Sequence, residues 1–277
     1  MTPVRRLWHE ASGPGWGPLP ELLLALTLVT GLVDAVSILV LGRVFVANMT
    51  GNVVFSGFAI AGAPGFSLSA SAFALAGFLT GAALGGRLTR QAGHDRALHL
   101  RAATVAELVL VAAALVIAVT SGGPAASHGT LHLAGGRAVA PFSAAVTDSL
   151  ALVLAVAMGI QNSAARKLAV PDLTTTVLTM TLTGIGADAR SGSRGVFTLA
   201  RRVLTVAVML GGGILGAWLV LQVSTTAALA VAVGLLVVAA VCAALAARKP
   251  APWRPAGLPP ARHRLGATPT PPAPSPR

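Results

Sequence analysis

VFVANMTGNVVFSGFAIAG occupies Val44–Gly62 and directly follows a long apolar run that ends at Leu41. A counterpart, DLTTTVLTMTLTGIGAD, occupies Asp172–Asp188 and also follows a long apolar run. Both stretches are apolar overall, yet they carry amide and hydroxyl side chains where a lipid-facing helix would carry none. We therefore interpret them as re-entrant or broken helices, which must be buried in protein or line a wet cavity.

The composition of the chain indicates whether its surface faces water or lipid. Of 277 residues, 55% are hydrophobic and only 10% are charged, with a mean hydropathy of +0.78. Soluble domains carry about 25% charged residues, so this chain has too little charge to cover a surface in water. We expect an all-α integral membrane protein whose main partner is the lipid bilayer. The net charge of +12 lies in short clusters between apolar runs, so it indicates topology and no nucleic-acid partner.

Six apolar runs are long enough to cross a bilayer, which takes about 20 residues. They are Leu19–Leu41, Leu68–Leu88, Ala102–Thr120, Pro141–Ala165, Val203–Val223 and Ala227–Ala247. If neither polar stretch crosses, all of the 20 Lys and Arg residues except Arg43 and Arg137 lie on one side. Eight crossings would place the basic loop Arg87–Arg101 opposite the other basic segments. The positive-inside rule therefore predicts six crossings, with both termini cytoplasmic.

The two halves of the chain match at an offset of about 128 residues, which places Gly31 on Gly159 and Asp34 on Asn162. Slightly further along, GAALG at Gly81–Gly85 falls on GGILG at Gly212–Gly216. Three crossings in each half would turn the second half upside down, a plan of secondary transporters and some channels. The predicted organisation is a cytoplasmic N-terminus (1–18), two inverted repeats (19–140 and 141–247) and a disordered Pro/Arg-rich cytoplasmic tail (248–277).

Asp34 is the foremost candidate for function, because it lies about two-thirds along the first span among apolar neighbours. A charged Asp at mid-membrane costs about 2.5–3.5 kcal/mol, so it should face the protein interior or an aqueous path. A protonated Asp in a structural hydrogen bond is the alternative. Amides and hydroxyls can replace the hydration shell of a solute, or they can simply join helices. The predicted sites for a small solute, proton or cation are Asp34, Asn48, Thr50, Asn52, Gln161, Asn162, Thr175, Thr176 and Thr179.

The remaining polar and small residues suit structural roles. Glu21 and Glu107 lie near predicted helix ends, where a carboxylate can cap or snorkel. The glycines fit helix packing through small residues; they are Gly77, Gly81, Gly85, Gly212 and Gly216. One cysteine, Cys242, excludes an internal disulfide. The chain has no HExxH, Walker-type or GxSxG motif, so we expect no catalytic residue, metal or cofactor, and no enzyme.

Four motifs carry a resemblance to a known family: VDA, VANMTGN, GIQN and PDLTTTVLTMTLT, at Val33–Ala35, Val46–Asn52, Gly159–Asn162 and Pro171–Thr183. Over roughly Leu22 to Ala247, the chain resembles the YoaK-like family of bacterial multi-pass membrane proteins, a group of unknown function. The resemblance implies a bacterial inner-membrane protein with about six or seven spans, and it brings no substrate or reaction. Met180 stands where Gly is expected.

The polar, interrupted segments favour a small-solute transporter or permease with a polar site near the midplane. Two alternatives stay open. The same residues could line a channel-like pore, or the protein could be a non-transporting scaffold or sensor whose basic tail binds anionic lipid. A homo-oligomer is compatible with each of these interpretations.

Overall fold

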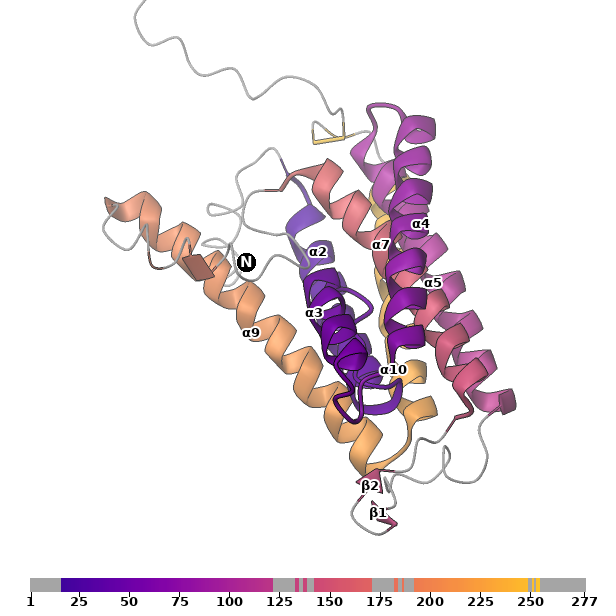
Figure 1. Cartoon of the computed structure of the whole chain (residues 1–277). Helices are drawn as coiled ribbons and strands as arrows, with labels where there is room; N and C mark the ends of the chain where they lie inside the picture. Colours follow the sequence, from indigo (N-terminus) through magenta and orange to yellow (C-terminus); the bar gives the residue numbers. More distant parts are fainter. Residues whose placement is uncertain are drawn as a thin grey trace, which may run out of the picture.

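Six long apolar helices form the body of the protein (Figure 1). The computed structural model describes residues 16–121, 133–134, 137–138, 142–170, 182–183, 186, 192–248, 251 and 253–254. The six helices are α2 (Leu19–Val40), α4 (Leu68–Ala92), α5 (Arg96–Ser121), α7 (Ala144–Leu168), α9 (Gly192–Gln222) and α10 (Thr225–Arg248). Two short strands, β1 (Leu133–Ala134) and β2 (Arg137–Ala138), pair antiparallel before α7. Each predicted span is confirmed, but the third begins at Arg96 instead of Ala102 and the fifth lies in a helix that begins at Gly192 instead of Val203.

A seventh helix, α3 (Met49–Ile60), lies within the first polar stretch and has only 12 residues. Its length of about 18 Å is well short of the roughly 30 Å hydrocarbon layer. The prediction that Val44–Gly62 does not form a span is therefore confirmed. Of the second polar stretch, only Leu182, Thr183 and Gly186 are described, so its path lies outside the described residues.

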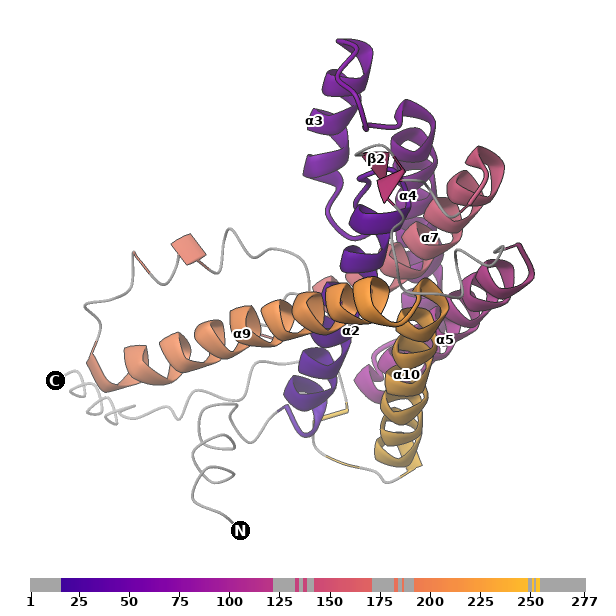
Figure 2. The ribbon, with the colours of Figure 1, turned by 90° about the horizontal axis from the view of Figure 1, so that it is seen from below.

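Glycines bring two pairs of helices into backbone contact. A Cβ at Gly81 in α4 would overlap the carbonyl oxygen of Val156 in α7. Likewise, a Cβ at Gly212 in α9 would overlap the carbonyl oxygen of Leu28 in α2. These close approaches confirm the predicted packing through small residues. The C-terminal half of α9 crosses α2, while its N-terminal half runs away from the other described helices (Figures 1 and 2).

The glycine contacts of one pair recur in the other. Gly31 in α2 lies against the carbonyl oxygen of Met209 in α9, and Gly159 in α7 lies against that of Phe78 in α4. Gly31 and Gly159 are the residues that the sequence offset aligns, and Phe78 and Met209 match at the offset of the two glycine motifs. In both pairs, residues further along one helix contact residues further along the other. Helix α2 therefore runs parallel to α9, and α4 runs parallel to α7.

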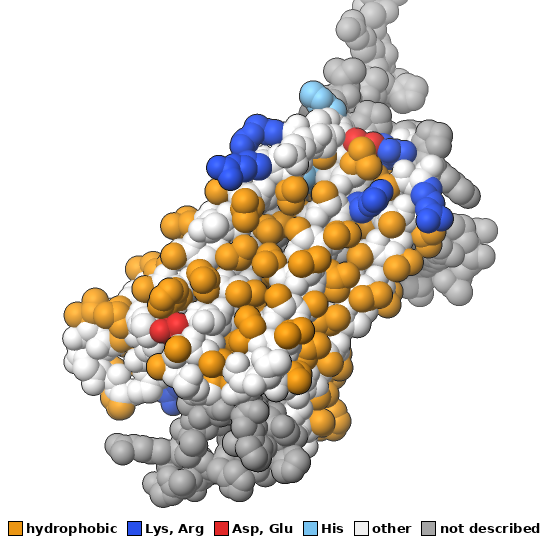
Figure 3. Space-filling model, turned by 90° about the vertical axis from the view of Figure 1, so that its right-hand side faces the viewer, with side chains coloured by type: hydrophobic (Ala, Val, Ile, Leu, Met, Phe, Trp, Pro, Cys, Tyr) orange, Lys and Arg blue, Asp and Glu red, His pale blue; other side chains and the backbone are white. Residues whose placement is uncertain are grey.

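The outer surface is an apolar belt with a cluster of positive charge at one end (Figure 3). Large hydrophobic side chains of α4, α5, α9 and α10 are exposed. They include Leu79, Val105, Val109, Val116, Leu210, Ile214, Val238 and Val241. Such a belt would aggregate in water and suits a bilayer. We call the end of the bundle that holds Arg87–Arg101 and Lys167 the basic end.

The start of the C-terminal tail docks at the basic end, a contact that the sequence does not reveal. The Arg254 guanidinium lies 2.5 Å from the carboxylate of Asp95, in the loop before α5. The carbonyl oxygen of Arg254 accepts a 2.8 Å hydrogen bond from the Arg96 N–H. Partial burial raises the pKa of Asp95, but hydrogen bonds from Arg254 and from the N–H groups of Leu98 and Ala97 outweigh it. The net pKa of Asp95 is therefore below its usual value.

Candidate functional site

The first polar stretch enters and leaves the bundle at the same point. Gly42, just after α2, lies so close to Ser67 that a Cβ on it would be 3.1 Å from the Ser67 Cβ. Next to it, the guanidinium carbon of Arg43 is 5.5 Å from the centre of the Phe66 ring. Residues 43–66 therefore start and end at the same end of the bundle, opposite the basic end. We call them the re-entrant segment.

Asp34 holds the part of the re-entrant segment that precedes α3, residues 43–48, which we call the descending arm. Its Oδ1 accepts hydrogen bonds from the backbone N–H groups of Val46 and Ala47, each 3.2 Å long. Asp34 precedes the end of α2 at Val40 by about 9 Å of helix, so the arm descends well into the bilayer. Non-helical backbone at that depth needs partners for its N–H groups, and the carboxylate accepts from two of them.

Asn52 joins the arm to α3. Its Oδ1 accepts a 2.8 Å hydrogen bond from the Phe45 N–H, and its Nδ2 donates a 2.6 Å bond to the Phe45 carbonyl oxygen. The Asn52 side chain is completely buried. The rings of Phe45 and Phe55 stack with their centres 5.6 Å apart, and Gly51 leaves room for Phe45. The arm and α3 thus form one unit.

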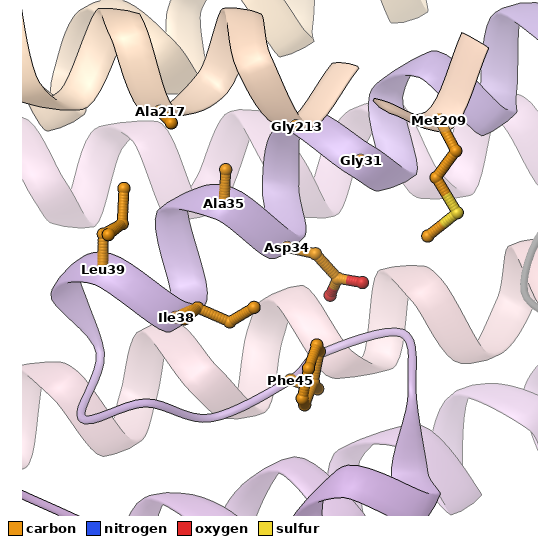
Figure 4. A pocket seen from close by; sticks show the side chains of 9 residues that line it. All are labelled: Gly31, Asp34, Ala35, Ile38, Leu39, Phe45, Met209, Gly213 and Ala217. Carbon is orange, nitrogen blue, oxygen red and sulfur yellow. The ribbon is translucent and has the colours of Figure 1, made fainter. Parts of the chain in front are cut away.

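An open pocket of about 320 Å³ lies beside Asp34, between α2, α9 and the descending arm. The Asp34 carboxylate projects from α2 in the direction of Phe45 and Met209 (Figure 4). Asp34 is 6% exposed, and no described residue donates a hydrogen bond to its second oxygen, Oδ2. The pocket is lined by Gly31, Asp34, Ala35, Ile38, Leu39, Phe45, Met209, Gly213 and Ala217. It therefore offers one carboxylate in apolar surroundings.

The structure brings together only some of the predicted site residues. Asp34 and Asn52 are joined through the arm, whereas Asn48, just before α3, and Thr50, in its first turn, are exposed. Gln161 donates a 2.8 Å hydrogen bond to the Thr30 hydroxyl, one turn before Asp34 on α2. The sequence alone does not identify Thr30 as its partner. Asn162 is half-buried next to Gln161 in α7. Three predicted residues, Thr175, Thr176 and Thr179, lie outside the described residues.

Glu107 departs from its prediction. It is completely buried, and since α5 begins at Arg96, it lies about three turns inside the helix. The expectation that it caps or snorkels at a helix end is therefore wrong. Glu21 does lie in the first turn of α2, where a carboxylate interacts favourably with the positive end of the helix dipole.

Comparison with known proteins agrees with this architecture. The model of a family described as "Protein of unknown function (DUF1275)" matches residues 22–242. The chain is also similar to the UPF0700 transmembrane protein YoaK of Bacillus subtilis (strain 168), with 34% identity over 167 residues. That match covers 60% of this chain and 65% of the relative. No solved structure gives a significant match. The chain therefore belongs to the DUF1275 family and is a multi-pass membrane protein of that uncharacterised group.

Proposed function

We propose that the protein is a transporter or permease for small organic cations, which bind in the pocket beside Asp34. The observation that carries this proposal is the position of Asp34 at the inner turn of the re-entrant segment. Its Oδ1 holds the backbone of the arm, and Asp34 also lines the pocket. A membrane-buried carboxylate is expensive, and a bound cation would offset that cost.

The lining of the pocket favours an amphipathic cation. Asp34 is the one charged residue among the lining residues described, and Phe45 is the one aromatic residue. A carboxylate suits an ammonium group, an aromatic ring attracts a cation, and the aliphatic walls suit an apolar body. A volume of about 320 Å³ is at the lower end of ligand pockets, which favours a small solute.

We also infer that the two halves are inverted repeats, which accords with a transport function and not with an enzyme. Support comes from the recurring glycine contacts, in which the α2–α9 pair matches the α4–α7 pair. With a non-crossing segment in each half, an odd number of crossings would turn one half over. The basic end would face the cytoplasm of a bacterial inner membrane, and both chain termini would lie there. Movement of one pair against the other would give alternating access.

The test is uptake into proteoliposomes of small amines, each compared with a neutral molecule of the same shape. Asp34→Asn removes the charge but keeps a side-chain oxygen that can accept from the Val46 and Ala47 N–H groups. The matched control is Asp148→Asn, at a carboxyl that accepts a hydrogen bond from the Ser69 hydroxyl and does not line the pocket. We expect saturable amine uptake that falls about tenfold or more in Asp34→Asn, a loss of about 1.4 kcal/mol. Uptake by Asp148→Asn should be unchanged.

Three results would contradict the proposal. Equal amine uptake by Asp34→Asn and the unaltered protein would remove the pocket from the transport path. Flux that rises without saturation would favour a channel-like pore. No flux of any amine, with monodisperse protein, would favour a scaffold or sensor.

A further inference from the structure

A second acidic residue, Glu107, is buried in the core of the bundle, away from the pocket. Its side chain is completely buried, and neither carboxyl oxygen has a hydrogen-bond partner among the described residues. It lies roughly 16 Å along α5 from Arg96, which is about half of the 30 Å hydrocarbon thickness. A carboxyl group without partners at this depth is a poor structural element, since an unsatisfied buried polar group costs about 1–3 kcal/mol.

The surroundings of Glu107 are apolar. Ala103 and Leu110, about one turn to either side on α5, belong to an apolar cluster that includes Ile160 and Val156 of α7. The helices packed against α5 are α4, α7 and α10, and their ionisable groups all lie within about two turns of a helix end. These groups are Arg87 and Arg90 of α4, Asp148, Arg166 and Lys167 of α7, and Cys242 and Arg248 of α10. None of them offers a counter-charge at the depth of Glu107.

The buried face of α5 has a different polarity on the two sides of Glu107. On the side of the basic end, Thr104 lies one turn away and is buried, and His99 follows one turn further. The Nε2 atom of His99 is 3.3 Å from the Thr89 hydroxyl of α4. Away from the basic end, the buried positions are apolar, namely Val111, Ala114 and Ala118. On the buried face of α5, groups that can relay a proton therefore lie only on the side of the basic end.

We propose that Glu107 is a proton-binding site that exchanges its proton with water at the basic end, by way of Thr104 and His99. In the closed arrangement the carboxyl is neutral, because an ionised carboxylate here would lack both counter-charge and donors, at a cost of several kcal/mol. Release breaks the Glu107 O–H bond, passes the proton to water and leaves a carboxylate. That carboxylate needs hydration, so release requires the basic end of the α5–α7–α10 core to open. The proposal does not depend on the pocket at Asp34.

Infrared spectroscopy of the full-length protein in liposomes tests the proposal directly. The C=O stretch of a protonated carboxyl is recorded as pH rises from about 4 to about 10, a range that brackets ordinary carboxyl and buried carboxyl titrations. We expect a band that disappears with rising pH in the unaltered protein and is missing in Glu107→Gln. Glu107→Asp should retain a shifted band, which separates loss of the carboxyl from loss of the fold. Asp34→Asn, which removes the other buried carboxyl of the described residues, should leave the Glu107 band in place.

The direction of access is tested by the exchange of the carboxyl proton for deuterium. Thr104→Val, which keeps the shape but removes the hydroxyl, should slow the deuterium shift of the band about tenfold or more. Val111→Thr, its counterpart on the other side, should leave the rate unchanged. The proposal is overturned if the band persists in Glu107→Gln, if the Glu107 band is unchanged over the whole pH range, or if the two threonine variants exchange alike.

Discussion

Substitution of Asn52 should release the re-entrant segment. The side chain makes both hydrogen bonds that join the arm to α3, one to the N–H and one to the carbonyl oxygen of Phe45. Asn52→Ala removes both partners while leaving the helix backbone intact. A buried backbone group that loses its partner costs about 1–3 kcal/mol, and these two groups are partly buried. At the lower end of that range, the arm should lose about 2 kcal/mol of local stability.

Hydrogen exchange measured by mass spectrometry on the protein in detergent reports this loss locally. A loss of about 2 kcal/mol corresponds to a roughly 30-fold rise in the exchange rate of the amides around Phe45. Asn48→Ala is the matched control, because Asn48 is an exposed amide of the same segment whose side chain makes no capping hydrogen bond. Its effect should stay within about 0.5 kcal/mol. Equal exchange in the two variants would show that Asn52 does not hold the arm.

Two further predictions concern helix packing and the docked tail. Gly81→Ala should destabilise the protein by about 1–3 kcal/mol in denaturant unfolding, because the new Cβ would overlap backbone of α7. Gly57→Ala in α3, where nothing lies within 4 Å, should instead stabilise it by about 0.5–1 kcal/mol; equal effects would refute the contact. The ion pair of Asp95 and Arg254 should stabilise the protein above about pH 4 and lose its effect as pH falls below that value, because the pKa of folded Asp95 is lowered. Asp95→Asn should thus lower the melting temperature at neutral pH but not near pH 2, and an equal loss at both pH values would argue against the ion pair.

The spans could be predicted from the sequence because the requirement for a crossing is local. About 20 consecutive apolar residues suffice, and six runs meet that condition. The first polar stretch was also recognisable, because its amides and glycines interrupt an apolar pattern and α3 is too short to cross. What the sequence could not give is the docking of Arg254 on Asp95, since it joins residues far apart in the chain.

The candidate site was only partly predictable. Asp34 stood out as an acid within an apolar run, but its bonds to the Val46 and Ala47 N–H groups depend on the reversal of the chain after α2. The prediction that Glu107 lies near a helix end was wrong because the arginines before it are typical of a loop. In the structure, Asp95 accepts from the Ala97 N–H at 2.9 Å and so starts α5 earlier than hydropathy indicates.

Cysteine accessibility tests most directly whether residues 43–66 enter and leave the membrane at one face. In a Cys242→Ala background, single cysteines replace three exposed residues, Arg43, Pro64 and Arg90. Arg43 and Pro64 lie at the start and near the end of the re-entrant segment, and Arg90 lies at the basic end. A membrane-impermeant maleimide is then applied from each side. We expect Arg43→Cys and Pro64→Cys to react from the same side and Arg90→Cys from the other. Reaction of Arg43→Cys and Pro64→Cys from opposite sides would show that the segment crosses the bilayer, and the site beside Asp34 would lose its basis.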